Sequence, residues 1–383
     1  MRLLFYAPLK PIDHPVPSGD RRLGQLLVAA LARAGHHVEI ACRLRTRIDR
    51  GDPTLQARQA ATSGRIAARL IRRYRDRPVG GRPEAWFTYH LYYKAPDWLG
   101  PAVAAALRIP YMVAEASLAP KRAKGPWAVG HQAVLAALSR ADTVFAMSAA
   151  DAECLGPALG QRTRLVRLKP FLDPSAYGAA AARRSEHRRR LAQEFALEPA
   201  MPWLIAVAMM RSGDKLRSYE LLGAALARLL DRPWRLLVVG DGPARPAVEA
   251  ALQPLGSRLA FMGERDAEAL PGLYAAADLL VWPAINEAFG MVLLEAQAAG
   301  TPVVAGATGG VPEVVQSEAG GVLVPVGDAT AFADAVASLL DDPVRLGRLA
   351  AETRRLVARD HGIDAAAHTL DAALRRSVAG MTA

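Results

Sequence analysis

The stretch NEAFGMVLLEAQAAGTPVVAG, residues 286–306, places Glu287 and Glu295 on either side of an apolar run, and a second apolar segment follows. On a helix, side chains eight residues apart lie within roughly 80° and about 12 Å of each other. We therefore expect Glu287 in the turn before a helix, Glu295 in its third turn, and residues 289–291 at the helix start. Unpaired N–H groups at such a start favour an anion such as phosphate. Alternatively, Glu287 caps the helix and Glu295 is a solvated surface residue.

The composition predicts a globular protein of two domains. Its 383 residues suffice for two ordinary cores, and 51% hydrophobic with 22% charged residues is typical of a soluble chain. No apolar run in the sequence is long enough to span a bilayer. The N-terminal MRLLFYAPLKP is typical of a buried strand rather than a signal peptide. Cys42 and Cys154 are too few for a disulfide framework, so we expect a cytoplasmic protein.

The net charge of +11 comes from the N-terminal half. Residues 1–200 hold 32 Lys and Arg against 16 Asp and Glu, a net charge of +16. The excess gathers in the segments 43–50, 65–77 and 183–190. These arginines either coat solvated helices or attract an anionic acceptor or membrane surface. No aromatic-rich basic strand accompanies them, so nucleic acid is not an expected partner.

One basic segment, 65–77, has the pattern of an interfacial helix. Ile66, Leu70 and Ile71 fall on one side, with arginines around them. Peripheral contact with an anionic membrane, on the inner face, is therefore one expectation for this segment. The other is that the same apolar side is buried in the domain.

Strand and helix patterns alternate along the whole chain, as in α/β proteins with parallel sheets. In the first half, strands are predicted at 2–9, 36–42, 84–90, 110–116 and 143–148, and a helix at 21–35. A proline-containing linker is predicted at 167–178. In the second half, strands are predicted at 203–209, 235–240, 259–263, 279–283, 302–306 and 321–326. We therefore expect two Rossmann-like, doubly wound domains, with a ligand cleft at the carboxyl ends of their strands.

The loops after the C-terminal strands carry residues suited to a nucleotide. Gly240 and Gly242 let the backbone approach a ligand closely. The backbone at 262–264 is expected to be exposed to the edge of a base. Arg211 and Lys215 can pair with a diphosphate as two cations.

As a set, these motifs resemble the retaining glycosyltransferases of family 4, which have the GT-B fold. The resemblance is carried by the spacing of Glu287 and Glu295 and by the segments FGMVLLEAQAAGTPVV, GGVPEVV, FMGERDAEALPGLYAAADLLVWP and VVGDGP. It is looser in the N-terminal half, where Gly19 lies in an expected loop before the first helix and His90 ends a strand. The family usually spaces its Arg and Lys by five residues, whereas Arg211 and Lys215 are four apart.

The resemblance implies the GT-B architecture, in which two Rossmann-like domains face each other across a cleft. It implies an acceptor-binding domain at 1–174, a nucleotide-sugar-binding domain at 175–356, and a C-terminal helix, 357–383, packed back on the N-terminal domain. By the same resemblance, Glu295 would accept hydrogen bonds from the ribose and Glu287 would contact the donor sugar. The candidate catalytic residues are Glu287, Arg211, Lys215 and His90. The candidate nucleotide-binding residues are Glu295, Phe289, Gly290, Met291, Gly240, Gly242, Met262, Gly263 and Gly19.

The implied reaction moves a hexosyl group, with retention, from a UDP-, GDP- or ADP-sugar to a glycan, lipid-linked or small-molecule acceptor. Charge growing on the leaving diphosphate requires preorganised cations and N–H dipoles. Arg211, Lys215 and the helix start near Gly290 would supply them, and no suitably placed Asp-x-Asp motif occurs, so no metal is expected. Two alternatives remain open, a nucleotide-sugar epimerase of the same fold and a noncatalytic nucleotide- or glycan-binding protein.

Overall fold

The computed structural model describes residues 1–16 and 18–382 and divides the chain into two compact units. The first unit is Met1–Lys169 with the C-terminal segment that starts at Ile363, and the second is Pro170–Gly362. The boundaries expected from the sequence, 174/175 and 356/357, are displaced for a local reason. The backbone N–H of Leu172 donates to the carbonyl of His361 at 3.0 Å. This bond joins the start and the end of the second unit, so both segments belong to that unit.

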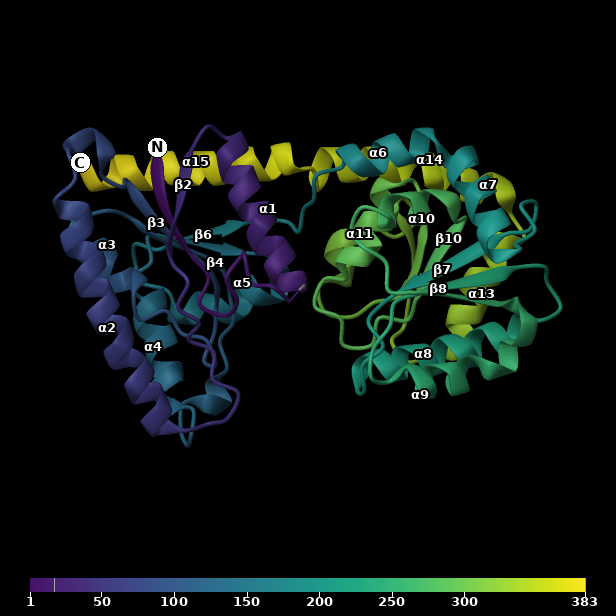
Figure 1. Cartoon of the computed structure of the whole chain (residues 1–383), viewed down its shortest axis with the longest axis horizontal. Coiled ribbons are helices and arrows are strands. Elements are labelled where there is room, and N and C mark those ends of the chain that lie inside the picture. Colours follow the sequence, from purple (N-terminus) through teal and green to yellow (C-terminus); the bar gives the residue numbers. More distant parts are fainter. Residues whose placement is uncertain (17, 383) are drawn as a thin grey trace. The chain divides into compact units, whose positions relative to one another are not determined.

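The first unit is built on a six-stranded parallel sheet with the strand order β2-β1-β3-β4-β5-β6 (Figure 1). Its strands are β1 (Arg2–Tyr6), β2 (His37–Cys42), β3 (Ala85–Leu91), β4 (Tyr111–Ala116), β5 (Thr143–Ala146) and β6 (Arg164–Arg167). Its helices are α1 (Gly19–Arg33), α2 (Pro53–Arg75), α3 (Gly100–Leu107), α4 (Ala128–Leu138), α5 (Ala149–Leu155) and α15 (Ile363–Thr382). The strand order reverses between β1 and β3, which makes this point the switch point of the sheet.

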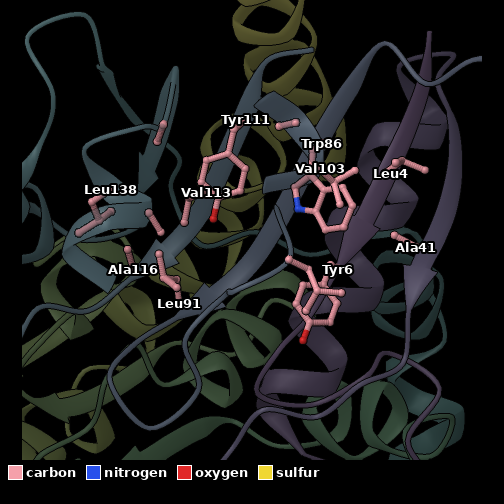
Figure 2. Packing of buried hydrophobic residues seen from close by; sticks show 14 of the residues in the cluster. Leu4, Tyr6, Ala41, Trp86, Leu91, Val103, Tyr111, Val113, Ala116 and Leu138 are labelled. Carbon is pink, nitrogen blue, oxygen red and sulfur yellow. The ribbon is translucent and has the colours of Figure 1, made fainter. Parts of the chain in front are cut away.

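The core of the first unit includes a cluster of aliphatic side chains built around a few large aromatic ones. Figure 2 shows Tyr6, Trp86 and Tyr111 on neighbouring strands, and all three are at most 2% exposed. The rings of Tyr6 and Trp86 meet edge to face, with centroids 6.1 Å apart. The other face of the sheet is buried as well, because Phe5, Phe87 and Phe145 are at most 1% exposed and their rings stack in sequence.

Helix α2 contains the segment that was a candidate interfacial helix. Leu70 is 7% exposed, and Ile66 and Ile71 pack against the core of the first unit. The apolar side is therefore buried in the domain and is not free to enter a membrane. Of the two expectations, the structure supports burial, and the arginines of α2 occupy its outer side.

Helix α15 closes the first unit. It packs against α1, which runs at an angle to it (Figure 1). At and just after the end of α1, Arg33 pairs with Asp364 and His36 Nε2 lies 3.0 Å from Asp371 Oδ1. Farther along, the hydroxyls of Thr143 and Ser377 are 2.9 Å apart. The C-terminal helix is thus part of the first unit although it follows the second in sequence.

The second unit repeats the plan with the strand order β12-β11-β10-β7-β8-β9, again all parallel. Its strands are β7 (Trp203–Val207), β8 (Arg235–Val239), β9 (Leu259–Gly263), β10 (Leu279–Trp282), β11 (Val303–Gly306) and β12 (Gly321–Val324). Its helices are α6 (Ser175–Ala182), α7 (Arg184–Phe195), α8 (Asp214–Leu226), α9 (Arg245–Leu252), α10 (Leu270–Ala276), α11 (Met291–Ala298), α12 (Val311–Val314), α13 (Ala329–Leu340) and α14 (Pro343–Asp360). The switch point of this sheet lies between β7 and β10.

The stretch 286–306 forms a turn, a helix and a strand, but the helix is shorter than expected. Helix α11 begins at Met291, after Gly290 with a φ of 69°. Glu295 therefore lies in its second turn rather than its third, and the helical geometry expected between the two glutamates does not apply. Leu293 and Leu294 are fully buried, so the apolar run does belong to the core.

Candidate functional site

A pocket of about 560 Å³ lies at the carboxyl end of the second sheet. It is formed by the loops that follow β7, β8 and β9, together with Val292 of α11. Three of the predicted residues, Arg211, Gly240 and Gly242, line it. Arg211 is exposed, and among the residues that the structure describes no carboxylate pairs with its guanidinium. A cation without an internal partner in such a pocket suits an anionic ligand.

Glycine is required in the turn after β8. Gly240 and Gly242 have φ values of 133° and 153°, and a Cβ at either position would collide with the carbonyl of Ala208 or Met210. The turn is bound to its neighbours, because Met210 N donates to Asp241 O at 2.9 Å. Residues of both loops, among them Ala208 and Gly242, line the pocket.

An ion pair crosses the switch point of the second sheet. Lys215, in the first turn of α8, lies with Nζ 2.5 Å from Oε2 of Glu287, in the loop after β10. Trp282 Nε1 donates to the same oxygen at 3.3 Å, and its ring lies 5.3 Å from Lys215 Nζ. The structure thus brings together two of the predicted catalytic residues, although neither lines the pocket itself.

Glu295 lies on α11 and accepts a hydrogen bond from the hydroxyl of Tyr274 at 2.9 Å. Burial and the charge of Glu295 raise the pKa of Tyr274 well above its ordinary value, so the phenol remains a donor. The alternative of a freely solvated Glu295 is therefore wrong, because one carboxylate oxygen is held by a buried partner.

Several predicted binding residues are placed differently from expectation. Phe289 and Gly290 belong to the turn before α11, and only Met291 is helical. The carbonyls of Met262 and Gly263 accept hydrogen bonds within the protein, from Arg265 Nε and Gly240 N at 2.9 and 2.8 Å.

Gly19 does not lie in a loop. It is the first residue of α1, which Ser18 caps, and a Cβ there would meet no atom within 4 Å. Local geometry therefore does not require glycine at this position.

His90 belongs to a cluster within the first unit. Its Nδ1 lies 3.2 Å from Asp20 Oδ1 and 3.5 Å from Glu115 Oε1. Burial lowers the pKa of His90, but the charges of Glu115 and Asp20 outweigh it and the net shift is upward. Burial raises the pKa of Glu115, whereas the close approach of the His90 ring lowers the pKa of Asp20.

Two residues near the second site escaped the sequence predictions. Arg265 lines the pocket and follows β9 inside the motif FMGERD, so its position after a strand was a usable signal. Trp282 contacts both members of the Lys215–Glu287 pair, but a tryptophan in an apolar strand gives no sign of a polar contact.

Neither metal ligation nor membrane spanning finds support among the described residues. Over 1–16 and 18–382, His, Cys, Asp and Glu side chains form no group of three with the geometry of a metal site. No helix in the same part of the chain has the length and hydrophobicity needed to cross a bilayer.

Comparison with known proteins identifies the family. The family described as "Glycosyl transferases group 1" matches residues 202–342. A D-inositol 3-phosphate glycosyltransferase of Xylanimonas cellulosilytica is 30% identical over 308 residues, which are 76% of this chain and 72% of the relative. A protein of the same name from Corynebacterium jeikeium is 42% identical over 145 residues, 35% of each chain. For most other relatives of this name, the chain spans only about a third to a half of their length.

Solved structures agree on the fold. Sucrose-phosphate synthase from Thermosynechococcus elongatus matches 99% of this chain and 100% of its own, with a TM-score of 0.73 and 23% identity. Anabaena HepE in complex with UDP-glucose matches 99% and 100%, with a TM-score of 0.67 and 19% identity. The two six-stranded parallel sheets and these neighbours show the GT-B fold. Because the Xylanimonas relative is 30% identical and matches 72% of its own length, the chain belongs to the group 1 family of glycosyltransferases.

Proposed function

We propose that this glycosyltransferase moves a hexosyl group, with retention of configuration and without a metal ion, from a nucleotide-diphosphate sugar to a phosphorylated polyol. The main support for a nucleotide-sugar donor is the pocket at the second sheet, which is lined by the unpartnered Arg211. A bound diphosphate would supply the negative partner that the Arg211 guanidinium does not have within the protein. UDP-glucose in HepE supports a uridine nucleotide as the first donor to test.

Transition-state charge grows on the leaving diphosphate, and the groups that would stabilise it are Arg211 and Lys215. Lys215 stands at the start of α8, where backbone N–H groups add to its charge. Its contact with Glu287 fixes the ammonium before the reaction, so little reorganisation is required. Glu287 in turn keeps one carboxylate oxygen for a hydroxyl of the donor sugar.

The proposed acceptor follows from a second pocket, of about 510 Å³, within the first unit. Arg47, Arg50 and Arg58 line it, together with Asp49. Arg47 pairs with Asp49 at 2.7 Å, and in the described part of the chain neither Arg50 nor Arg58 has a carboxylate partner. Two uncompensated guanidinium groups suit a phosphate monoester, and the name of the relatives, D-inositol 3-phosphate glycosyltransferase, supports the same class.

The donor side can be tested by thermal unfolding with UDP, GDP, ADP and their glucose conjugates. A ligand at a hundredfold excess over its Kd stabilises by about 2.7 kcal/mol. Arg211→Ala should lose this stabilisation, while Arg228→Ala, an exposed arginine outside the pocket, should keep it. If no nucleotide stabilises the wild type, the donor proposal is wrong.

The acceptor side can be tested by transfer to inositol 3-phosphate and to unphosphorylated inositol. Arg50→Ala and Arg58→Ala should raise KM for the phosphate ester about tenfold or more, whereas Arg69→Ala, an exposed arginine on the same helix, should not. NMR of the product's anomeric centre tests retention, and activity in excess EDTA tests metal independence. Equal transfer to both acceptors would refute the phosphate pocket.

A further inference from the structure

The switch point of the first sheet holds a cluster of three titratable side chains from three elements. Asp20 comes from the first turn of α1, His90 from β3 and Glu115 from β4. The side chains of His90 and Glu115 are each only 16% exposed, and Asp20 is 40% exposed. Both carboxylates approach the same ring atom, Nδ1, at 3.2 and 3.5 Å.

The backbone aims two of these side chains at each other. His90 and Glu115 have φ values of 62° and 57°, which are unusual for residues with a Cβ. They lie on adjacent parallel strands, between the register pairs Tyr89–Ala114 and Leu91–Ala116. Left-handed residues within regular strands persist only where their surroundings hold them, and they are frequent at functional sites.

We propose that Asp20 and Glu115 are positioning residues for His90, which hold its Nδ1–H between two carboxylates and leave Nε2–H as a charged donor to a sugar hydroxyl. Among the described residues, no hydrogen bond reaches either ring nitrogen of His90, and Nδ1 meets the two carboxylates through ion-pair contacts. The ring of Tyr92 lies 5.3 Å from that of His90, so an aromatic surface borders the donor. The proposed function identifies this hydroxyl as one of the transferred sugar or of its acceptor, and this part of the inference rests on that function.

The charge of the cluster favours a hydroxyl over a phosphate. His90 is the one cation of the three, and the charge of Asp151 also raises its pKa. The charge of Lys10 lowers the pKa of Asp20. Tyr89 beside Glu115 and Tyr92 beside His90 are neutral. A phosphate oxygen bound to Nε2 would meet carboxylates on the far side of the ring, whereas a neutral hydroxyl would not be repelled. The raised pKa of His90 agrees with an imidazolium that persists near neutral pH.

NMR titration of the full chain with ¹³C-labelled histidine rings tests the cluster without requiring turnover. The His90 signal is assigned as the one of eight that His90→Gln removes. In Glu115→Gln and Asp20→Asn its midpoint should move to lower pH, and in Glu153→Gln, an exposed carboxylate on α5, it should not. If Glu115→Gln fails to fold, Asp20→Asn decides, because its side chain is the more exposed of the two. An unchanged midpoint in the folded variants would overturn the positioning role.

Kinetics separate positioning from a merely structural role. In Glu115→Gln, kcat/KM for UDP-glucose should fall about tenfold at pH 8 and approach the wild type at pH 6, where the imidazole regains its proton. A loss of equal size at both pH values would contradict the charged donor. If the midpoint is lowered but no nucleotide binds, the positioning role stands and the proposed function fails.

Discussion

The two sheets each carry an ion pair across their switch point, and the polarity of the pair is reversed between them. In the first unit, an acid on the helix after β1, Asp20, meets a base at the end of β3, His90. In the second unit, a base on the helix after β7, Lys215, meets an acid after β10, Glu287. Asp20 and Lys215 are both the second residue of their helices.

The surroundings of the two pairs differ more than their positions. His90 is shared with a second buried carboxylate, Glu115, on a left-handed backbone. Lys215 and Glu287 lie near glycine turns and a pocket with an unpartnered arginine. The same topological position therefore holds a histidine shared by two carboxylates in one unit and a lysine–glutamate pair in the other.

The largest effect should come from breaking the second pair. Lys215→Ala removes the cation at the start of α8 and leaves Glu287 without its charged partner. We expect kcat at saturating donor to fall about a hundredfold or more, as when a preorganised charge is lost. Arg217→Ala is the matched control, because this exposed residue pairs with Asp214 instead. Normal kcat with only a raised KM would show that Lys215 acts in ground-state binding.

Most of the architecture was predictable because buried parallel strands are short apolar runs between loops. Strand β6 was missed, since Arg164 and Arg167 at its ends are exposed and an edge strand need not be apolar. Motif spacing located Glu287 and Lys215, but their mutual contact depends on loop conformation. The start of α11 was misjudged because the left-handed Gly290 delays the helix.

The second prediction concerns Glu295 and the ribose. Glu295→Gln should weaken nucleotide binding by about 1.5–3 kcal/mol, roughly ten- to a hundredfold in Kd. Glutamine keeps an oxygen for the Tyr274 hydroxyl, so the loss would report the missing charge rather than a broken internal contact. Calorimetric titration with UDP measures it, with the exposed Glu268→Gln as control. Wild-type affinity in Glu295→Gln would place this carboxylate outside the nucleotide site.

The third prediction tests the glycine turn that distinguishes the second site. Gly240→Ala forces a Cβ against the Ala208 carbonyl, and we expect it to destabilise the protein by about 2 kcal/mol. Gly256→Ala has a positive φ of 56° but no neighbour within 4 Å, so it controls for backbone strain alone. Thermal unfolding should rank Gly240→Ala clearly below this control. Equal melting temperatures would mean that the approach to the Ala208 carbonyl adds no cost beyond backbone strain.

The smallest effect should be the pH dependence of the first pair. The close approach of the His90 ring lowers the pKa of Asp20, so the stability that Asp20 contributes is present above its ordinary value of 3.8 and lost as pH falls through the lowered one. For His90, burial lowers the pKa but Glu115 and Asp20 raise it further, so its contribution is complete below the ordinary 6.5 and lost as pH rises through the raised value.

The Asp20–His90 coupling should therefore be greatest between pH 3.8 and 6.5 and decline toward pH 9. A double-mutant cycle with Asp20→Asn and His90→Gln isolates this coupling from the burial of each side chain. It is measured by thermal unfolding at pH 5.5, 7.5 and 9. A coupling that keeps its size at pH 9 would mean that the contact does not depend on the imidazolium, and the contrast between the two switch points would then be one of geometry alone.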